Sequence, residues 1–222
     1  MPKQLVIIHI GKCGGGSIAD AVKKGLIGAE LVHVEKPKYV NSNQYVILIR
    51  DPVSRFISAF NWKMFRCTTA EGMRYQGMPK PKDKDEIAGY KYWKSIGNFA
   101  DNLYNDKGVI NPIALKLIKA SNHLKFDISF YIRDLLPFLS KDNCQVIRCE
   151  YFDKDVKNIL GISSIGNEKH VYNKEQFDSH VSAKGRRNLR RLLEKDYACF
   201  RKLRQKKLIK KRYFDDVNHK NR

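Results

Sequence analysis

Two long apolar runs near the start of the chain show the pattern of buried strands. Residues 4–10 (QLVIIHI) are apolar almost throughout and rich in β-branched side chains, and residues 44–50 (QYVILIR) repeat this pattern. Continuous apolar runs, unlike alternating ones, are typical of strands covered on both faces in a parallel sheet. Apolar residues at helical spacing follow each run, in SIADAVKKGL and in DPVSRFISAF. This alternation predicts an α/β fold with a central parallel sheet.

Capping residues set the expected bounds of the two helices. Ser17 is the predicted N-cap of the first helix, and Gly25 is its predicted stop. Asp51 is the predicted cap of the second helix, and Pro52 suits its first position. The short apolar stretch AELVHV between the two helices is expected to form a further strand.

The remainder of the chain predicts elaborations of the same domain. Residues 68–92 are polar and rich in Gly, Pro and Lys, which predicts a loop insertion or lid. CQVIRCEYF has the pattern of another strand. Over residues 182–212, leucines and aromatic residues at helical spacing predict one basic C-terminal helix. A length of 222 residues suits a single domain, residues 1–222.

The charge of the chain is strongly unbalanced. Its 43 Lys and Arg residues against 23 Asp and Glu residues give a formal net charge of +20. Such an excess favours polyanionic partners, among them nucleic acids, acidic membranes, anionic polysaccharides and multiply charged nucleotides. The charge alone does not choose among them.

The cysteines and the apolar runs exclude several classes. The five cysteines form an odd set without CxxC spacing (Cys13, Cys67, Cys144, Cys149 and Cys199). An odd set cannot form a complete disulfide framework, and its spacing does not suit zinc, so we expect reduced thiols and no metal site. No apolar run approaches the roughly 18 residues that span a membrane, and no signal peptide precedes the first strand. We therefore expect a cytoplasmic protein without a membrane span.

A glycine-rich loop, GKCGGGS, joins the first strand to the first helix at residues 11–17. A strand, a glycine loop and a helix N-terminus together form an anion site, because main-chain N–H groups converge there and the helix dipole adds positive potential. The loop is not a Walker A motif, since Gly16 precedes Ser17 and the only lysine, Lys12, stands at the front. No dinucleotide-binding fingerprint fits it either. The sequence predicts a phosphate-binding loop of a different kind.

A second candidate motif, RDPVSRFIS, begins where the second strong strand ends. Arg50 leaves that strand at the carboxyl edge of the predicted sheet, which is where open α/β sheets bind ligands. Ser58 follows it by a little over two helical turns. An arginine fork and a hydroxyl suit a second phosphate group; the alternative is that Arg50 only pairs with Asp51 or a helix end.

Together the two motifs resemble those of sulfotransferases that use 3′-phosphoadenosine 5′-phosphosulfate (PAPS), most closely the carbohydrate O-sulfotransferase branch. In that family a PKTGGTS-like loop holds the 5′-phosphosulfate and an RDPxxRxxS element holds the 3′-phosphate. The present loop differs at Gly11, Cys13 and Gly16, which stand where the family has Pro, Thr and Thr. The resemblance implies a P-loop-like three-layer α/β/α fold and the product 3′-phosphoadenosine 5′-phosphate (PAP).

The resemblance also implies roles for individual residues. The donor would be bound by Arg50, Ser58 and every residue of the loop: Gly11, Lys12, Cys13, Gly14, Gly15, Gly16 and Ser17. Lys12 would stabilise charge on the leaving oxygen, and no metal would be required. The acceptor would be a compound with a hydroxyl group, namely a saccharide. If the saccharide is anionic, a basic groove of the protein could bind it.

A general base must take the proton of the acceptor hydroxyl, and histidine is suited to this task. His33 stands at the predicted end of the short strand, where related carbohydrate sulfotransferases carry a basic His or Glu. We therefore predict His33 as the base, with Glu35 as the alternative, and His170 as a contact to the acceptor or the nucleotide. His9, inside the first strand pattern, is expected to be a core residue.

Two other classes of function compete with this prediction. One is a P-loop-like kinase of nucleotides or small molecules, which is disfavoured because no lysine directly precedes Ser17. The other is a basic nucleic-acid-binding module that uses the C-terminal helix, although no RNA-binding signature is present.

Overall fold

The structure is a computed structural model that describes residues 4–75, 78–162 and 177–219. The chain forms two compact units. The first comprises the described parts of Met1–Pro52, Phe126–His170 and Lys195–Lys220, and the second those of Val53–Lys125 and Val171–Glu194.

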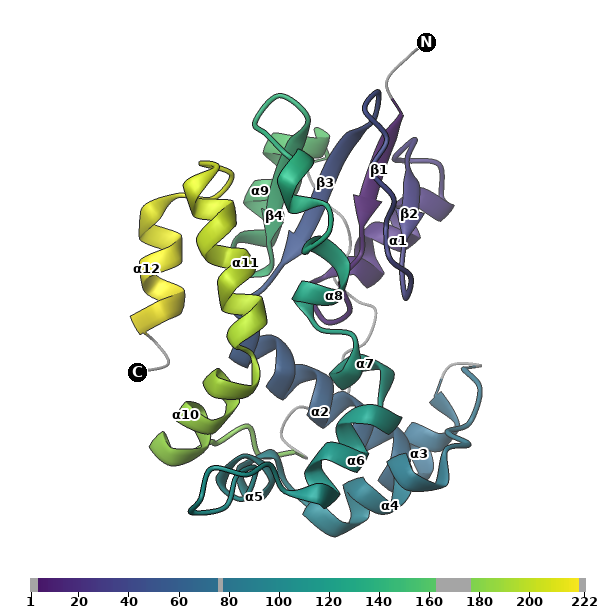
Figure 1. The fold of residues 1–222 in the computed structure, drawn as a ribbon. Coiled ribbons are helices and arrows are strands. Elements are labelled where there is room, and N and C mark those ends of the chain that lie inside the picture. The colour runs from purple at the N-terminus through teal and green to yellow at the C-terminus, as the bar shows by residue number, and fades with distance from the viewer. Residues whose placement is uncertain (1–3, 76–77, 163–176, 220–222) are drawn as a thin grey trace. The chain divides into compact units, whose positions relative to one another are not determined.

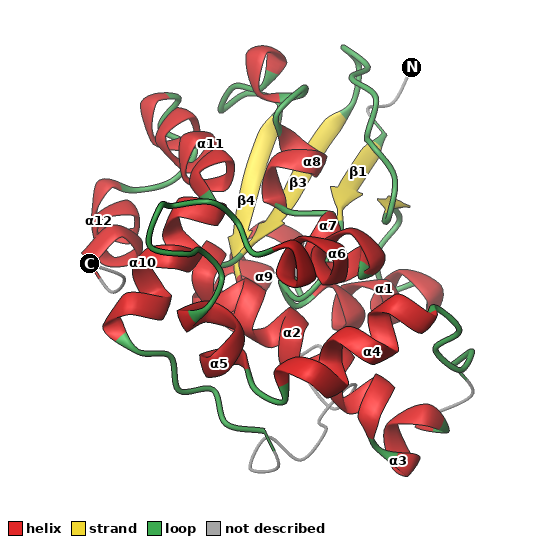
Figure 2. Ribbon diagram, turned by 60° about the horizontal axis from the view of Figure 1, so that its bottom comes forward, coloured by secondary structure: helices red, strands yellow, loops and turns green. Residues whose placement is uncertain are grey.

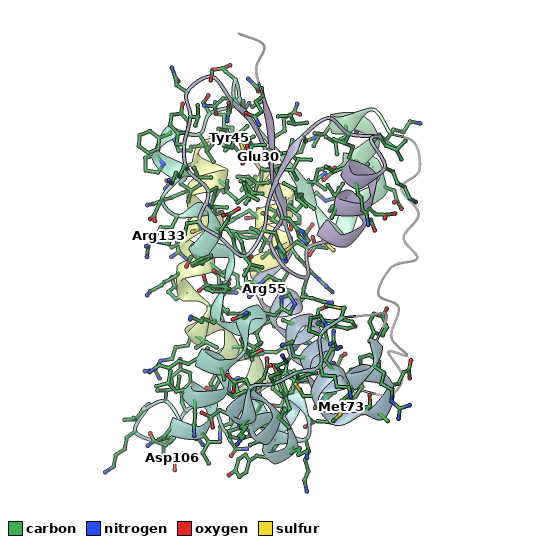
Figure 3. The ribbon with its side chains drawn as sticks, turned by 90° about the vertical axis from the view of Figure 1, so that its right-hand side faces the viewer. Glu30, Tyr45, Arg55, Met73, Asp106 and Arg133 are labelled. Atoms are coloured by element: carbon green, nitrogen blue, oxygen red, sulfur yellow. The ribbon has the colours of Figure 1, made fainter. Side chains whose placement is uncertain are left out.

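The first unit contains a four-stranded sheet in which all neighbouring strands are parallel. Its order is β2-β1-β3-β4, with the strands β1 (Leu5–Ile8), β2 (Glu30–Val32), β3 (Gln44–Ile49) and β4 (Cys144–Arg148). Figure 3 shows Glu30 and Tyr45 together at the end of the sheet where the strands begin. The apolar side chains of β1 and β3 are almost all buried, which confirms the predicted central parallel sheet.

Helices cover both faces of this sheet. Figure 1 shows α8 in front of the sheet and α1 and α9 behind it, and Figure 2 shows α11 and α12 beside the β4 edge. The helical elements of this unit are α1 (Gly15–Lys23), α8 (Ile128–Ile132), η2 (Leu136–Phe138), η3 (Cys149–Tyr151), α9 (Phe152–Leu160), α11 (Glu194–Gln205) and α12 (Lys211–His219). The α/β fold class is thereby confirmed, with its helices arranged around a parallel sheet.

The second unit is helical and has an aromatic core. Its helices are α2 (Pro52–Thr68), α3 (Ala70–Met73), α4 (Lys84–Trp93), α5 (Ile96–Asp101), α6 (Pro112–Ala120), α7 (Asn122–Lys125) and α10 (Ala183–Leu192). Phe60 packs against Tyr90 and Phe99 with ring centroids 5.0 and 5.1 Å apart. A partly buried ion pair of 2.8 Å joins Lys63 on α2 to Glu86 on α4. This core explains why α2 carries apolar residues on one face.

The prediction of a loop over residues 68–92 is wrong, because α3 and most of α4 lie there. The Asp83 side chain accepts hydrogen bonds from the N–H groups of Asp85 and Glu86, so it caps α4. Tyr90 and Trp93 then anchor the helix in the core. Burial of these rings outweighs the polar, glycine-containing composition that suggested a loop.

The prediction of one helix over residues 182–212 is also wrong, because the segment contains α10, α11 and the start of α12. Ser182 caps α10 by accepting a hydrogen bond from Gly185 N–H. Lys207 follows α11 with a positive φ of 58°, a conformation that does not continue a right-handed helix. Apolar spacing alone did not show these interruptions.

Candidate functional site

The glycine loop lies at the carboxyl end of β1 and leads into α1. Gly14 is the N-cap of α1 with φ 86°, and it provides no side-chain hydrogen bond to the helix. The first N–H groups of a helix have no partner within the helix. A helix that begins without a side-chain cap, immediately after a glycine turn, is therefore suited to binding an anionic group.

The predicted N-cap, Ser17, is instead inside α1 and buried. The helix begins earlier because Gly14 readily adopts the positive φ that the turn requires. A Cβ on Gly14 would also lie 2.8 Å from the Phe152 ring. The stop predicted at Gly25 is confirmed, since Lys24 is the C-cap and Gly25 has φ 73°.

Gly15 is a glycine because the His9 ring occupies the space beside it. A Cβ on Gly15 would lie 1.7 Å from Cδ2 of His9. The expectation that His9 is a core residue of the strand is wrong: β1 ends at Ile8, and His9 is only half-buried next to the start of α1. Its N–H donates to Val32 O over 2.9 Å, which fixes the backbone just past the strand.

His33 lies directly after β2 and stacks on His9. The ring centroids are 4.0 Å apart and the ring planes differ by 14°. His33 Nδ1 is 2.8 Å from His9 O. Because a carbonyl oxygen can only accept, Nδ1 carries the proton in this contact, and the neutral ring has its lone pair on Nε2. A half-buried histidine held in this tautomer can act as a base.

Two cationic side chains of the predicted site come from neighbouring positions of the same sheet edge. Lys12 has φ 70° in the turn after β1, and Arg50 directly follows β3. Arg50 Nη1 is 3.4 Å from Lys12 O, so the second motif contacts the main chain of the first. Lys12 precedes Gly15, the first residue of α1, by three positions and Arg50 contacts the carbonyl of Lys12, so both residues favour an anion at this turn.

A carboxylate outside the two motifs supports this edge. Glu150 Oε1 accepts a hydrogen bond of 2.8 Å from Asp51 N–H, and its Oε2 accepts one of 2.9 Å from Tyr213 Oη. Burial and the Glu150 charge raise the pKa of Tyr213, so its hydroxyl stays protonated and donates. In the sequence Glu150 falls inside the predicted strand CQVIRCEYF, but β4 ends at Arg148, two residues before it.

Other predicted residues lie where the structure gives them different surroundings. Cys13 is fully buried, and Glu35 is exposed two residues beyond His33. Ser58 is half-buried on α2 and belongs to the second unit, so its role stays a prediction. His170 lies outside the described residues.

Arg55, the second arginine of RDPVSRFIS, has a structural place. It is buried on α2, and its Nη1 donates to His123 O over 3.2 Å; Figure 3 labels it.

Among the residues that the structure describes, no cluster of three His, Cys, Asp or Glu side chains could hold a metal ion. In the same part of the chain, no helix is long and apolar enough to cross a bilayer.

The fold and this edge are typical of α/β proteins that bind phosphate groups at the carboxyl ends of parallel strands. The sequence pattern of the sulfotransferase family matches residues 17–219, which is most of the chain. The chain therefore belongs to the sulfotransferase family. No curated protein and no solved structure matches it.

Membership of this family makes the chain an enzyme that uses PAPS as sulfuryl donor, releases PAP and sulfates a hydroxyl-bearing acceptor. The kinase and the nucleic-acid-binding module are thereby set aside as main functions. The residues at this edge fit PAPS. A helix N-terminus without a side-chain cap, a lysine and an arginine are all suited to anionic phosphosulfate and phosphate groups.

Proposed function

We propose that the chain transfers the sulfuryl group to a saccharide hydroxyl, with His33 as general base. The observation that carries this proposal is the 2.8 Å contact between His33 Nδ1 and His9 O, which leaves Nε2 as the basic atom. The stacked His9 ring holds the imidazole in place. Nε2 takes the proton of the attacking hydroxyl as the oxygen forms its bond to sulfur.

Lys12 and the N-terminus of α1 form the electrostatic part of the proposed machinery. PAPS supplies the activated sulfuryl group, whose in-line transfer places negative charge on the leaving oxygen. The Lys12 ammonium group and the N–H groups of Gly15 and Gly16 stabilise that charge without moving a proton. The Cys13 thiol, which is buried, takes no part.

Arg50 and Ser58 bind the 3′-phosphate in this proposal. Arg50 is oriented by its contact with Lys12 O, and Asp51 beside it is tied to Glu150. The guanidinium fork suits two phosphate oxygens at once. Recognition of the 3′-phosphate distinguishes PAPS from ATP-type nucleotides.

The saccharide acceptor is supported by two properties of the chain. Its loop and its RDPVSRFISAF motif resemble the carbohydrate branch of PAPS-dependent sulfotransferases. Its net charge of +20 favours acceptors that already carry negative groups. We therefore expect an anionic polysaccharide to be a better acceptor than a neutral alcohol.

The test is a transfer assay with labelled PAPS, using a partly desulfated anionic polysaccharide, a tyrosine peptide and a simple phenol. His33→Ala is expected to lower kcat on the polysaccharide by about 100-fold or more, with the affinity for PAP unchanged. Lys12→Ala is expected to lower kcat by a similar factor of about 10²–10³. His180→Ala, which changes an exposed histidine, is the matched control.

The outcomes separate the parts of the proposal. Near-full activity of the His33→Ala variant would show that His33 is not the base. Loss of activity in the Glu35→Ala variant would point to Glu35 instead. Transfer to the phenol or the peptide in preference to every saccharide would overturn the acceptor class, while the donor and the base would stand.

A further inference from the structure

A groove beside β4 is lined by residues that the chemistry above does not use, apart from Tyr213, whose hydroxyl donates to Glu150. Its volume is about 680 Å³, within the range of ligand sites. One side is the outer edge of β4, one is α9, and one is the segment 207–213, which contains the end of the turn after α11 and the start of α12. All three belong to the first unit, and Figure 1 shows β4 as the outer strand next to α11.

The groove is lined by cations without anionic partners. Lys141, Lys154, Lys207, Lys210 and Arg212 line it and are exposed, and none of them forms an ion pair within the described parts of the chain. Arg148 is the exception, because its guanidinium binds Asp155 in a two-pronged contact of 2.6 and 2.7 Å. Within the described parts of the chain the remaining positive charge has no matching anion, so the groove favours an anionic ligand.

The wall of the groove is held in place. Lys206 Nζ donates to Leu139 O over 2.9 Å and to Pro137 O over 3.3 Å, so the segment after α11 is tied to the chain before β4. Lys207 and Lys210 are thereby kept opposite the strand edge. A groove with fixed walls needs little ordering when a ligand enters.

The edge of β4 directs unused main-chain groups into this groove. The N–H of Tyr45 on β3 donates to Asn143 O, and Tyr45 is level with Cys144, so the odd-numbered residues of β4 point their main-chain groups towards β3. The even-numbered residues point theirs outward. Cys144 N–H is used by Ser140 O and Arg148 N–H by Asp155, as expected for outward groups.

Val146, between these two residues, is itself buried, but it has the outward N–H of the edge that remains without a partner among the described residues. It lines the groove, and among the described residues no atom accepts a hydrogen bond from its N–H. Free edges usually carry lysines on the strand itself, which prevents pairing with other chains. Here β4 reads CQVIR, and the lysines stand on the walls instead.

We propose that this groove binds an extended acidic segment of a partner protein, which adds to β4 as a further strand. Main-chain pairing with Val146 sets the position of the segment, and its carboxylates meet Lys154, Lys210 and their neighbours. A second copy of this chain is disfavoured as the partner, because each copy carries a net charge of +20. A polyanion without a peptide backbone would use the lysines but not the strand edge.

The probe is a short fluorescein-labelled peptide of alternating glutamate and valine, with binding to the full chain measured by fluorescence anisotropy. The comparison peptide has the same sequence with alternate amides N-methylated, which keeps the charge but prevents strand pairing. The unmodified peptide is expected to bind at least about tenfold more tightly, the loss that one poorly satisfied main-chain contact produces.

Variants of the protein test the same two features separately. Val146→Pro removes the outward N–H at a position where an edge strand tolerates proline, and Lys154→Gln/Lys210→Gln removes two wall charges. Each of these two variants is expected to bind the unmodified peptide about tenfold more weakly, while PAP binding is retained. Lys84→Gln/Lys91→Gln, which changes two exposed lysines of α4, is the charge-matched control and should leave the affinity unchanged.

Equal binding of the two peptides would overturn strand addition, and it would do so even if Val146→Pro failed to fold. The proposal would also be overturned if a sulfated oligosaccharide or an RNA of equal charge bound more tightly than the peptide. Loss of binding in the Lys84→Gln/Lys91→Gln control would place the site elsewhere. None of these results depends on the identity of the sulfate acceptor.

Discussion

At the scale of single residues, Arg50 separates recognition of the 3′-phosphate from general attraction of anions. Arg50→Ala is expected to weaken PAP binding by about tenfold or more, because a charge-assisted, two-pronged contact is lost. Binding of adenosine 5′-phosphate, which has no 3′-phosphate, should change little. Calorimetry with both nucleotides measures the two effects, and Arg74→Ala, at an exposed position, is the control. An equal loss for both nucleotides would contradict the assignment.

Replacing Gly15 by alanine is expected to destabilise the protein, which is unusual for a glycine in a helix. In a helix, replacing Gly by Ala normally stabilises the protein by up to about 1 kcal/mol. At Gly15 the new Cβ would lie 1.7 Å from the His9 ring, so the ring must move. We expect Gly15→Ala to lower the free energy of unfolding by about 1–3 kcal/mol and to lower kcat, because His33 loses its stacking partner.

The matched control is Gly28→Ala, since a Cβ there meets no atom within 4 Å. Urea unfolding and the transfer assay measure both consequences for the two variants. If Gly15→Ala were as stable and as active as Gly28→Ala, the close approach of His9 to the helix would have no role in the site.

At the scale of elements, α12 is joined to the turn between β3 and α2. Tyr213 on α12 donates to Glu150, and Glu150 accepts from Asp51 N–H, the residue after Arg50. Tyr213→Phe leaves one carboxylate oxygen without this donor. We expect a loss of about 1 kcal/mol in the free energy of unfolding and a severalfold weaker affinity for PAP.

Thermal unfolding and calorimetry measure these two losses. Tyr39→Phe is the control, because the Tyr39 hydroxyl bonds only to exposed Asn41 and to Asn143 among the described residues. A variant that loses stability but keeps the full affinity for PAP would show that α12 supports the fold without positioning Arg50.

Elements differed in how well the sequence could predict them. β1 and β3 were predicted because each is a continuous apolar run whose side chains are buried. The helix α4 was missed because its stability comes from Asp83 capping it and from Trp93 entering a core contributed by other helices. The Asp83 cap is a local signal, but the partners of Trp93 lie on other helices, which local composition could not show.

The candidate site was predicted in the same uneven way. Motif position put Lys12 and Arg50 at strand ends, and the resemblance put His33 at another; the structure places all three directly after strands of one sheet, and their roles stay predictions. His9 was assigned to the core because it stands inside the apolar run. β1 ends one residue before it, and the run does not show this boundary. Glu150 was not assigned, because its contacts depend on Tyr213, 63 residues further along the chain.

At the scale of the whole molecule, buried thiol and phenol groups make the free energy of unfolding fall at alkaline pH. Cys67, Cys144 and Cys199 are free, and burial raises the pKa of each thiol to about 12. Burial also raises the pKa of Tyr90 and Tyr213. These groups ionise more readily in the unfolded chain than in the folded one.

The sign of the effect follows from proton binding. Where the folded pKa is raised, the stabilising contribution is complete below the unfolded pKa, about 9 for a thiol, and is lost as the pH rises towards the folded value. The free energy of unfolding should therefore be nearly constant up to about pH 8 and fall steeply between about pH 9 and pH 11. Each buried thiol contributes a slope of up to about 1.4 kcal/mol per pH unit in that window.

Urea unfolding under reducing conditions, repeated across this range, measures the slope. Cys144→Ala should reduce it by about the contribution of one thiol, whereas Cys149→Ala, at a half-buried position, should reduce it less. Comparing slopes rather than absolute values removes the constant cost of the cavity that each substitution leaves. A slope that is the same in wild type and Cys144→Ala would mean that the Cys144 thiol ionises equally in the folded and unfolded chains, contrary to its burial beside the groove at β4.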